Sequence, residues 1–417
     1  AMKTITILNS MKSGYFMLVA CVTLLLGATA CNDEEFGSEA LEVEKELALE
    51  ERIEQILSQY PRTRANFSTP VVMKTKIKNV HIQCFATEDV IVYWDSLDFT
   101  YIPKNTYDDY FFTFPNGEEE RVIFLEVSNQ AIQQLNVCCN DLTFLNVKNN
   151  INLEILSCDC NFLSDLRLTG CPNLKVVNAI TNNLSTLDVS HLTYLETLNL
   201  SMNELTAIDV SKNLNLQTLA IDSNPIKNLD ISKNTQLQIL LAGDTYITNL
   251  DLTNSTCLKE LYLFYLSDLQ TINNDHINSN SFSTFVELKV LDIQYTSFNA
   301  LNLPNDSLRY LDISGTPIKY LDISRLQIDY LNTTNSSLTT FEYTENSLFY
   351  AYYISVAGTP FEKYEFNLDY LITDAIPNRY NASRDGKIIK GRFITTLDLS
   401  VYERSYLKKR NWEVANH

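Results

Sequence analysis

Residues 196–216 read ETLNLSMNELTAIDVSKNLNL, and this pattern of leucine, asparagine and aspartate returns along the chain. A fixed period of this length predicts a solenoid, in which each repeat forms one coil and stacks on the next coil. Positions within a repeat are numbered here so that Glu196 is position 1 and Leu216 is position 21. The last leucine recurs at intervals of 21 residues through five intervals, at Leu153, Leu174, Leu195, Leu216, Leu237 and Leu258.

Position 3 begins the apolar pattern of each repeat, and an apolar or small residue usually follows two residues later. This alternation predicts a short strand with one buried face. Positions 10 and 13 are apolar again, and a single coil cannot bury them, so neighbouring coils must stack. Position 3 is occupied by Leu135, Leu156, Val177, Leu198, Leu219, Leu240, Leu261, Leu291, Leu311 and Leu331.

Position 8 is a polar column at the point where the chain leaves each strand. A sharp turn there leaves backbone donors and acceptors without partners, and a short amide or hydroxyl can satisfy them between adjacent coils. We therefore predict a structural role for this column, which consists of Asn140, Asn161, Asn182, Asn203 and Asn224, followed by Thr245, Thr296, Thr316 and Ser336.

The motif LxxLxLxxNxL, which residues 195–205 and 216–226 match closely, resembles the leucine-rich repeat family, and the LxxLDVS half is similar to repeats of Bacteroidetes surface lipoproteins. The resemblance implies a right-handed β/α superhelix of mostly parallel β coils over residues 133–340. It says little about function, because function lies on the faces of such a framework. The repeat that begins at Lys259 is 30 residues long and carries the polar insert NNDHINSNSFS, which is either a partner-binding loop or simply a longer loop.

Both ends of a repeat array need covers, because exposed apolar coils would aggregate. Residues 69–132 contain runs with the alternation of β-strands and predict a small β-rich N-terminal cap domain. Residues 341–417 predict a mixed α/β C-terminal cap, in which LDYLITDAIPNRY reads as a helix and YERSYLKKRNWEV as a helix followed by a strand with Trp412.

The first 68 residues predict export and lipid anchoring. Residues 1–30 read as a signal peptide that closes with LLLGATA before Cys31, which resembles a lipobox and makes Cys31 the lipidated residue. Residues 31–68 then form the lipid anchor and an acidic spacer helix, and the cluster NDEE at residues 32–35 resembles the Bacteroidetes signal for outward display. We expect an outer-membrane lipoprotein exposed at the cell surface that touches the membrane through its lipid alone. A solvated linker and a periplasmic orientation remain open.

The charge balance excludes one class of partner. The chain has 417 residues with 32 Lys and Arg against 51 Asp and Glu, a formal net charge of −19. Such a charge repels phosphate backbones, so nucleic acid is not an expected partner.

Recognisable catalytic chemistry is absent from the sequence. The four histidines, His81, His191, His276 and His417, lie in no known catalytic motif, and the regular carboxylates belong to the repeat. We therefore expect a non-enzymatic protein with no cofactor and no metal site. One alternative stays open, because stacked carboxylates at position 14 either form a hydrogen-bonded ladder or bind calcium through Asp188, Asp209, Asp230 and Asp251.

Two cysteines suggest a disulfide. Cys139 and Cys160 occupy position 7 of adjacent coils, at a spacing that suits the Cα separation of a disulfide, and an exported chain meets an oxidising compartment. Cys138 is a competing partner.

The character of the outward strand face, the concave face of such a solenoid, changes along the array. In the early coils the outward residues are small or polar, whereas in the later coils they become aromatic and acidic. Exposed aromatic side chains beside acids and amides indicate a face that binds a protein from a host or from the bacterial envelope. The alternative is a glycan-capturing accessory lipoprotein, and in a third interpretation the insert or the C-terminal segment covers the face. The predicted binding residues are Tyr262, Phe264, Tyr265, Asp292, Tyr295, Tyr310, Asp312 and Tyr330.

Overall fold

The computed structural model describes the repeat array and parts of both ends. The predicted signal peptide, the lipidation residue Cys31 and the acidic spacer lie outside the described residues. Among the residues described, no helix has the length and apolar character needed to cross a membrane. The described residues are 71–94, 98–113, 121–127, 131–273, 275–276, 282, 285–303, 306–361, 371, 391–395, 399 and 401–416.

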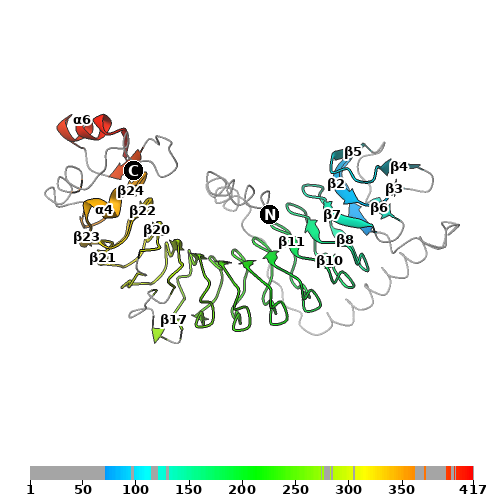
Figure 1. Ribbon diagram of the computed structural model, residues 1–417, viewed down its shortest axis with the longest axis horizontal. Coiled ribbons are helices and arrows are strands. Elements are labelled where there is room, and N and C mark those ends of the chain that lie inside the picture. The colour runs from blue at the N-terminus through cyan, green and yellow to red at the C-terminus, as the bar shows by residue number, and fades with distance from the viewer. Residues whose placement is uncertain are drawn as a thin grey trace, which may run out of the picture. The chain divides into compact units, whose positions relative to one another are not determined.

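The coils form a leucine-rich repeat solenoid, as predicted. One short strand from each coil joins a long sheet, and adjacent coil strands are parallel with the same repeat position in register, as in the pairing of Leu198 with Leu219 (Figure 1). In sheet order these strands are β7 (Ile132–Asn136), β9 (Ile155–Ser157), β11 (Val176–Asn178), β12 (Thr197–Asn199), β13 (Thr218–Ala220), β14 (Ile239–Leu241), β16 (Glu260–Tyr262), β19 (Val290–Asp292), β20 (Tyr310–Asp312), β22 (Tyr330–Asn332) and β24 (Tyr353–Ser355).

Shorter strands run in the second half of several coils. The two nearest the N-terminal end join a six-stranded sheet with strands from residues 71–126. The others pair locally, for example Leu250 with Ile272 and Leu321 with Phe341. These strands are β8 (Phe144–Asn146), β10 (Asp165–Arg167), β15 (Asn249–Leu250), β17 (Thr271–Ile272), β18 (Asp275–His276), β21 (Tyr320–Asp322) and β23 (Thr340–Glu342).

The inward leucines form one continuous core along the array. Position 3 is almost fully buried in every coil, as Leu198 and Leu311 illustrate, and the leucine at position 10, such as Leu205, is buried with it. Each buried leucine contributes about 2 kcal/mol of burial free energy, so the stacking of coils provides most of the stability. In the long repeat, the aromatic residues Phe282 and Phe285 fill this core instead.

The position 8 column is structural, as predicted. The side-chain amide of Asn203 donates to the carbonyls of Leu200 in its own coil and Ala179 in the preceding coil, and its oxygen accepts from the backbone of Leu184. The later threonines act differently, because the hydroxyl of Thr316 donates only within its own coil, to the carbonyl of Ile313.

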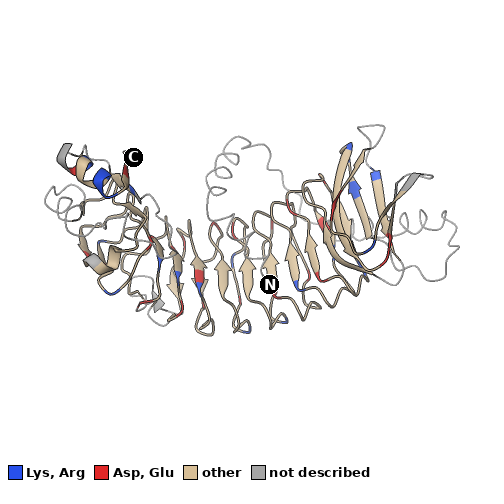
Figure 2. Ribbon diagram, turned by 45° about the horizontal axis from the view of Figure 1, so that its top comes forward, with Lys and Arg blue, Asp and Glu red and all other residues tan. Residues whose placement is uncertain are grey.

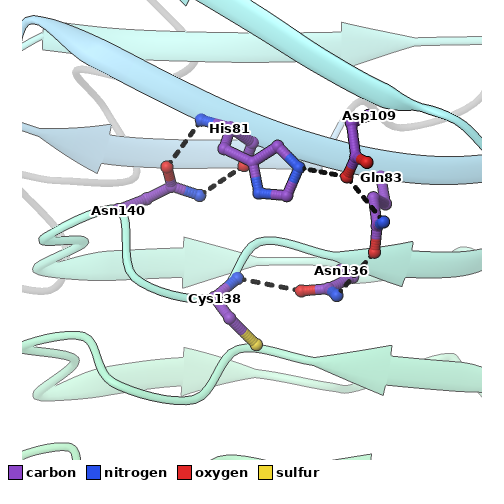
Figure 3. Close-up of polar contacts among 6 residues, drawn as sticks. All are labelled: His81, Gln83, Asp109, Asn136, Cys138 and Asn140. Carbon is purple, nitrogen blue, oxygen red and sulfur yellow. Dashed lines mark hydrogen bonds and ion pairs between the residues drawn. The ribbon is translucent and has the colours of Figure 1, made fainter.

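The N-terminal cap consists of strands, as predicted, and it extends both faces of the solenoid. Strand β2 pairs antiparallel with the first coil strand β7 and with β5, while β1 pairs antiparallel with β8. Asn140 begins the position 8 column and bonds to the backbone nitrogen and oxygen of His81 in β2, so the cap takes the place of a preceding coil (Figure 3). The cap strands are β1 (Val71–Thr75), β2 (Asn79–Ala86), β3 (Val90–Trp94), β4 (Asp98–Ile102), β5 (Asp109–Thr113) and β6 (Arg121–Glu126).

At the C-terminal end the coil pattern continues past residue 340. After the short helix α4 (Glu345–Leu348), strand β24 pairs in register with β22, and β25 (Gly391–Thr395) and β26 (Trp412–Asn416) extend the same sheet. The prediction of a helix followed by a strand with Trp412 is confirmed by α6 (Val401–Lys409) and β26. The other predicted helix, LDYLITDAIPNRY, lies outside the described residues except for Leu371.

Candidate functional site

Position 7 of every coil adopts a left-handed backbone, which directs its side chain outward beside the end of the strand. From Cys139 to Asn335, the backbone nitrogen of each such residue donates to the position 6 carbonyl of the next coil, as Asp244 does to Phe264. Because adjacent coils are in register, side chains of this column lie next to one another about 4.8 Å apart. The column, with φ between 49° and 72°, is Cys139, Cys160, Thr181, Met202, Ser223, Asp244, Tyr265, Tyr295, Gly315, Asn335 and Gly358.

Two exposed tyrosines in this column stack on each other. The ring centroids of Tyr265 and Tyr295 lie 4.9 Å apart with an interplanar angle of 9°, and the two residues are 52% and 42% exposed. Gly315 makes room for this two-tyrosine stack, since a Cβ atom on Gly315 would lie 2.5 Å from Cδ1 of Tyr295. The stack is therefore a preformed aromatic surface on the sheet face.

A second stack lies at position 2 of the following coils. Tyr330 is sandwiched between Tyr310 and Tyr353, with ring centroids 4.1 Å and 4.3 Å apart. We call Tyr310, Tyr330 and Tyr353 the three-tyrosine stack. All three are partly buried, and burial raises the pKa of each hydroxyl above its ordinary value.

Between the two stacks, at position 4, lies a buried pair of carboxyls. Asp292 and Asp312 occupy neighbouring strands in register. Burial and then the charge of Asp312 raise the pKa of Asp292 to about 8, against the lowering effect of hydrogen bonds from Gln294. Asp312 accepts from the backbone and hydroxyl of Ser314 and, at 2.8 Å, from the side chain of Asn332. We call these residues the aspartate pair.

The structure places the eight predicted binding residues on one stretch of the sheet face, but with unequal exposure. Tyr265 and Tyr295 are exposed, and Tyr262, Tyr310 and Tyr330 are half-buried. The expectation of an exposed side chain is wrong for Phe264, Asp292 and Asp312, which are buried. The Phe264 ring packs directly against the backbone of Gly243, where a Cβ atom would lie 2.7 Å from the ring, and so it is sheltered by its neighbouring coil.

Two further residues of this surface, Tyr353 and Asp244, were not among the predicted binding residues. Tyr353 completes the three-tyrosine stack, but it follows Tyr330 by 23 residues instead of the 20 that separate Tyr310 from Tyr330, so the repeat pattern hid it. Asp244 is exposed and directly precedes Tyr265 in the position 7 column. Its position in the repeat was a signal that could have assigned it to the face.

Within the described residues, the polar cluster of the cap does not form a catalytic arrangement. His81 Nε2 lies 2.7 Å from Oδ1 of Asp109, and Gln83 donates to the same oxygen (Figure 3). The thiol of Cys138 points away from His81 and bonds to Asp159 instead. Burial raises the pKa of the Cys138 thiol, with the charge of Asp159 adding to the rise, so this cysteine is a poor nucleophile.

The position 14 aspartates cap local turns. The carboxylate of Asp209 accepts from the backbone nitrogen of Ser211, and this bond, with one from the Ser211 hydroxyl, holds the pKa of Asp209 below its usual range. Asp188, Asp230 and Asp251 make the same turn with the residue two positions later. Across the described coils and caps, no three His, Cys, Asp or Glu side chains are grouped as a metal ion would require.

Cys139 and Cys160 are exposed free thiols at adjacent members of the position 7 column. Burial raises the pKa of the Cys160 thiol to about 11, and the neighbouring Cys139 adds to this rise. A disulfide between them remains a prediction.

Comparison with known proteins gives only structural likenesses. No protein-family model matches the chain, and no curated protein shows a significant match. The functional domain of InlJ from Listeria monocytogenes, which includes a cysteine ladder, is 25% identical over 56% of this chain, with a TM-score of 0.42. The leucine-rich effector protein YopM from Yersinia pestis is 15% identical over 54% of this chain and 78% of its own, with a TM-score of 0.40. The present chain covers 61% of the InlJ domain's length.

Proposed function

We propose that this chain is a non-enzymatic binding protein that holds a protein partner, from a host or from the bacterial envelope, on the outward face of its parallel sheet. The observation that carries the proposal is the two-tyrosine stack, where Tyr265 and Tyr295 are both exposed and are stacked at 4.9 Å. Rigid exposed tyrosines lose little conformational entropy on binding and are enriched at the centres of protein interfaces. Most coil strands are tan in Figure 2, and the late coils place the acids Glu260, Asp292 and Asp312 in their strands.

The arrangement favours a protein over a glycan partner. A sugar that lies on an aromatic platform needs an open ring face. Tyr330 has one neighbour on each face, at 4.1 Å and 4.3 Å, so its ring is closed to such stacking. Protein side chains can still pack against the ring edges and hydroxyls of the three-tyrosine stack.

The test compares partner capture by matched variants of the full chain. Tyr265→Ala combined with Tyr295→Ala removes the stack, and Tyr246→Ala removes an equally exposed tyrosine that lies outside the strand face. Wild type and Tyr246→Ala should capture the same protein from envelope or host-surface extracts, and the double variant should lose it while keeping the wild-type circular dichroism spectrum. Equal capture by all three proteins would refute the site. A glycan array that responds to the wild type and not to the double variant would support the glycan alternative instead.

We also propose that the protein is anchored by lipid at Cys31 and displayed outward from the outer membrane. The support is the sequence LLLGATAC and the acidic NDEE that follows it. Protease treatment of intact cells should remove the protein while periplasmic markers survive, and Cys31→Ala should release it from the membrane fraction. Resistance to protease until the outer membrane is opened would place the protein in the periplasm.

A further inference from the structure

The outward face around the two-tyrosine stack carries acidic residues and no basic residues. At the outward positions 2, 4, 6 and 7 of the coils from β14 to β24, the sequence has four acids and neither Lys nor Arg. The nearest bases precede the strands, and the described contacts of two of them point elsewhere: Lys259 donates to Gln238 and Arg309 to the carbonyls of Asp306 and Leu308. The four acids are Asp244, Glu260, Asp292 and Asp312.

One acid of this set is exposed next to an exposed ring. Asp244 and Tyr265 are consecutive members of the position 7 column, and the backbone nitrogen of Asp244 bonds at 2.7 Å to the carbonyl of Phe264. Ser223 donates to Oδ2 of Asp244 at 3.0 Å, which orients the carboxylate along the column. Burial raises the pKa of the Tyr265 hydroxyl, and its neighbour Tyr295 and the carboxyls of Asp292, Asp244 and Asp312 add to the rise.

A carboxylate beside a tyrosine ring is a favourable place for a planar cation. A guanidinium group can pair with the carboxylate and stack on the ring, and it is more weakly hydrated than an ammonium group. The aspartate pair lies below the surface, since both residues are buried, and because the pKa of Asp292 is about 8 the pair adds at most one negative charge at about pH 7. Resting on the proposed function, we propose that the protein partner presents an arginine side chain that pairs with Asp244 and packs on the Tyr265 ring, while Tyr295 supports that ring from its other face.

The experiment measures binding of fluorescein-labelled peptides to the full chain by fluorescence anisotropy. One peptide alternates glycine with four arginines, and a second of equal length alternates glycine with four glutamates. The arginine peptide should bind and the glutamate peptide should not. Asp244→Asn and Tyr265→Ala should each weaken binding of the arginine peptide by about tenfold, which is the loss of one charge pair or cation–π contact.

The controls separate a defined contact from general attraction to a chain of net charge −19. Asp230→Asn removes one exposed charge at position 14, where the asparagine can still cap the local turn, and Tyr246→Ala removes an exposed tyrosine away from the face. Both should bind the arginine peptide within about twofold of wild type. Equal losses for Asp230→Asn and Asp244→Asn would overturn the proposal, and so would the absence of arginine-peptide binding. If partner capture still depends on Tyr265 and Tyr295 in that case, the proposed function stands and only the arginine contact is refuted.

Discussion

The early coils, residues 133–237, and the late coils, residues 238–361, share one backbone and hold it together with different side chains. In the early coils a buried asparagine at position 8 bonds across to the preceding coil, as Asn203 does to Ala179 and Leu184. In the late coils a threonine bonds only to its own coil, and stacked tyrosines connect neighbouring coils on the outside. We call the asparagines of position 8 the amide ladder. Where this ladder ends, the outward sheet face becomes aromatic, and side chains on that accessible face make contacts between neighbouring coils.

The largest expected effect tests the amide ladder. Asn203→Ala leaves the buried backbone N–H of Leu184 without a partner, which costs about 1–3 kcal/mol. It also removes one of the two amide donors to each of the carbonyls of Ala179 and Leu200, at about 1 kcal/mol for each bond. We expect a loss of about 4 kcal/mol in the free energy of unfolding, measured by urea denaturation. Thr316→Ala, at the same position of a late coil, removes a single hydroxyl bond and should cost about 1 kcal/mol. Equal costs at the two positions would remove the distinction between the halves.

The second prediction concerns pH, because the late face contains a carboxyl whose pKa rises on folding. The native pKa of Asp292 is about 8, while an unfolded aspartate titrates near about 4. The native state binds this proton more tightly, so the contribution to stability is fully present below about pH 4 and is lost as the pH rises toward 8. Beyond Asp312, the side chains that interact with the Asp292 carboxyl include Gln294, Tyr262, Tyr265 and Tyr310.

Asp292→Asn should therefore flatten the pH dependence and raise stability at pH 8, relative to wild type, by about 3 kcal/mol. The early coils supply the matched variant Asp222→Asn. Burial raises the pKa of Asp222 to about 6, so that substitution should change stability mainly between about pH 4 and 6. Urea denaturation from pH 4 to 9 gives both profiles. An unchanged slope between pH 6 and 8 in Asp292→Asn would contradict the assignment.

The third prediction concerns the N-terminal end of the position 7 column, where two cysteines stand in place of the late tyrosines. Oxidised glutathione should convert the Cys139 and Cys160 thiols to a disulfide, with two hydrogens lost from the protein and two glutathione thiols formed. The bond closes a loop of about one repeat and should add about 2 kcal/mol to the free energy of unfolding. Intact mass and peptide mapping without reductant identify the bond, and Cys139→Ser is the control. A Cys138–Cys160 disulfide, or thiols that still react with maleimide after oxidation, would contradict the predicted disulfide between Cys139 and Cys160.

The period of the sequence was sufficient to predict the coils and the structural role of position 8. Both follow from local spacing, because each repeat places the same residue in the same environment. Exposure on the face was not predictable in the same way. Phe264 is buried because Gly243 in the neighbouring coil lets its ring lie on the backbone, and this depends on contact across coils. Tyr353 joins the three-tyrosine stack after an irregular interval, which only the strand pairing of Tyr330 with Tyr353 identifies.

The smallest expected effect distinguishes a backbone requirement from a side-chain requirement at position 7. Met202 and Thr181 adopt φ of 57° and 56° in the early coils, so this left-handed turn does not demand glycine. Gly315, at φ 67°, is different because a Cβ atom there would collide with the Tyr295 ring. Gly315→Ala should thus displace Tyr295, reduce the near-ultraviolet circular dichroism of the stacked rings and cost about 1 kcal/mol. In a Tyr295→Ala background the same substitution should cost clearly less, because only the backbone preference remains. An identical cost in both backgrounds would mean that the glycine serves the turn and not the two-tyrosine stack.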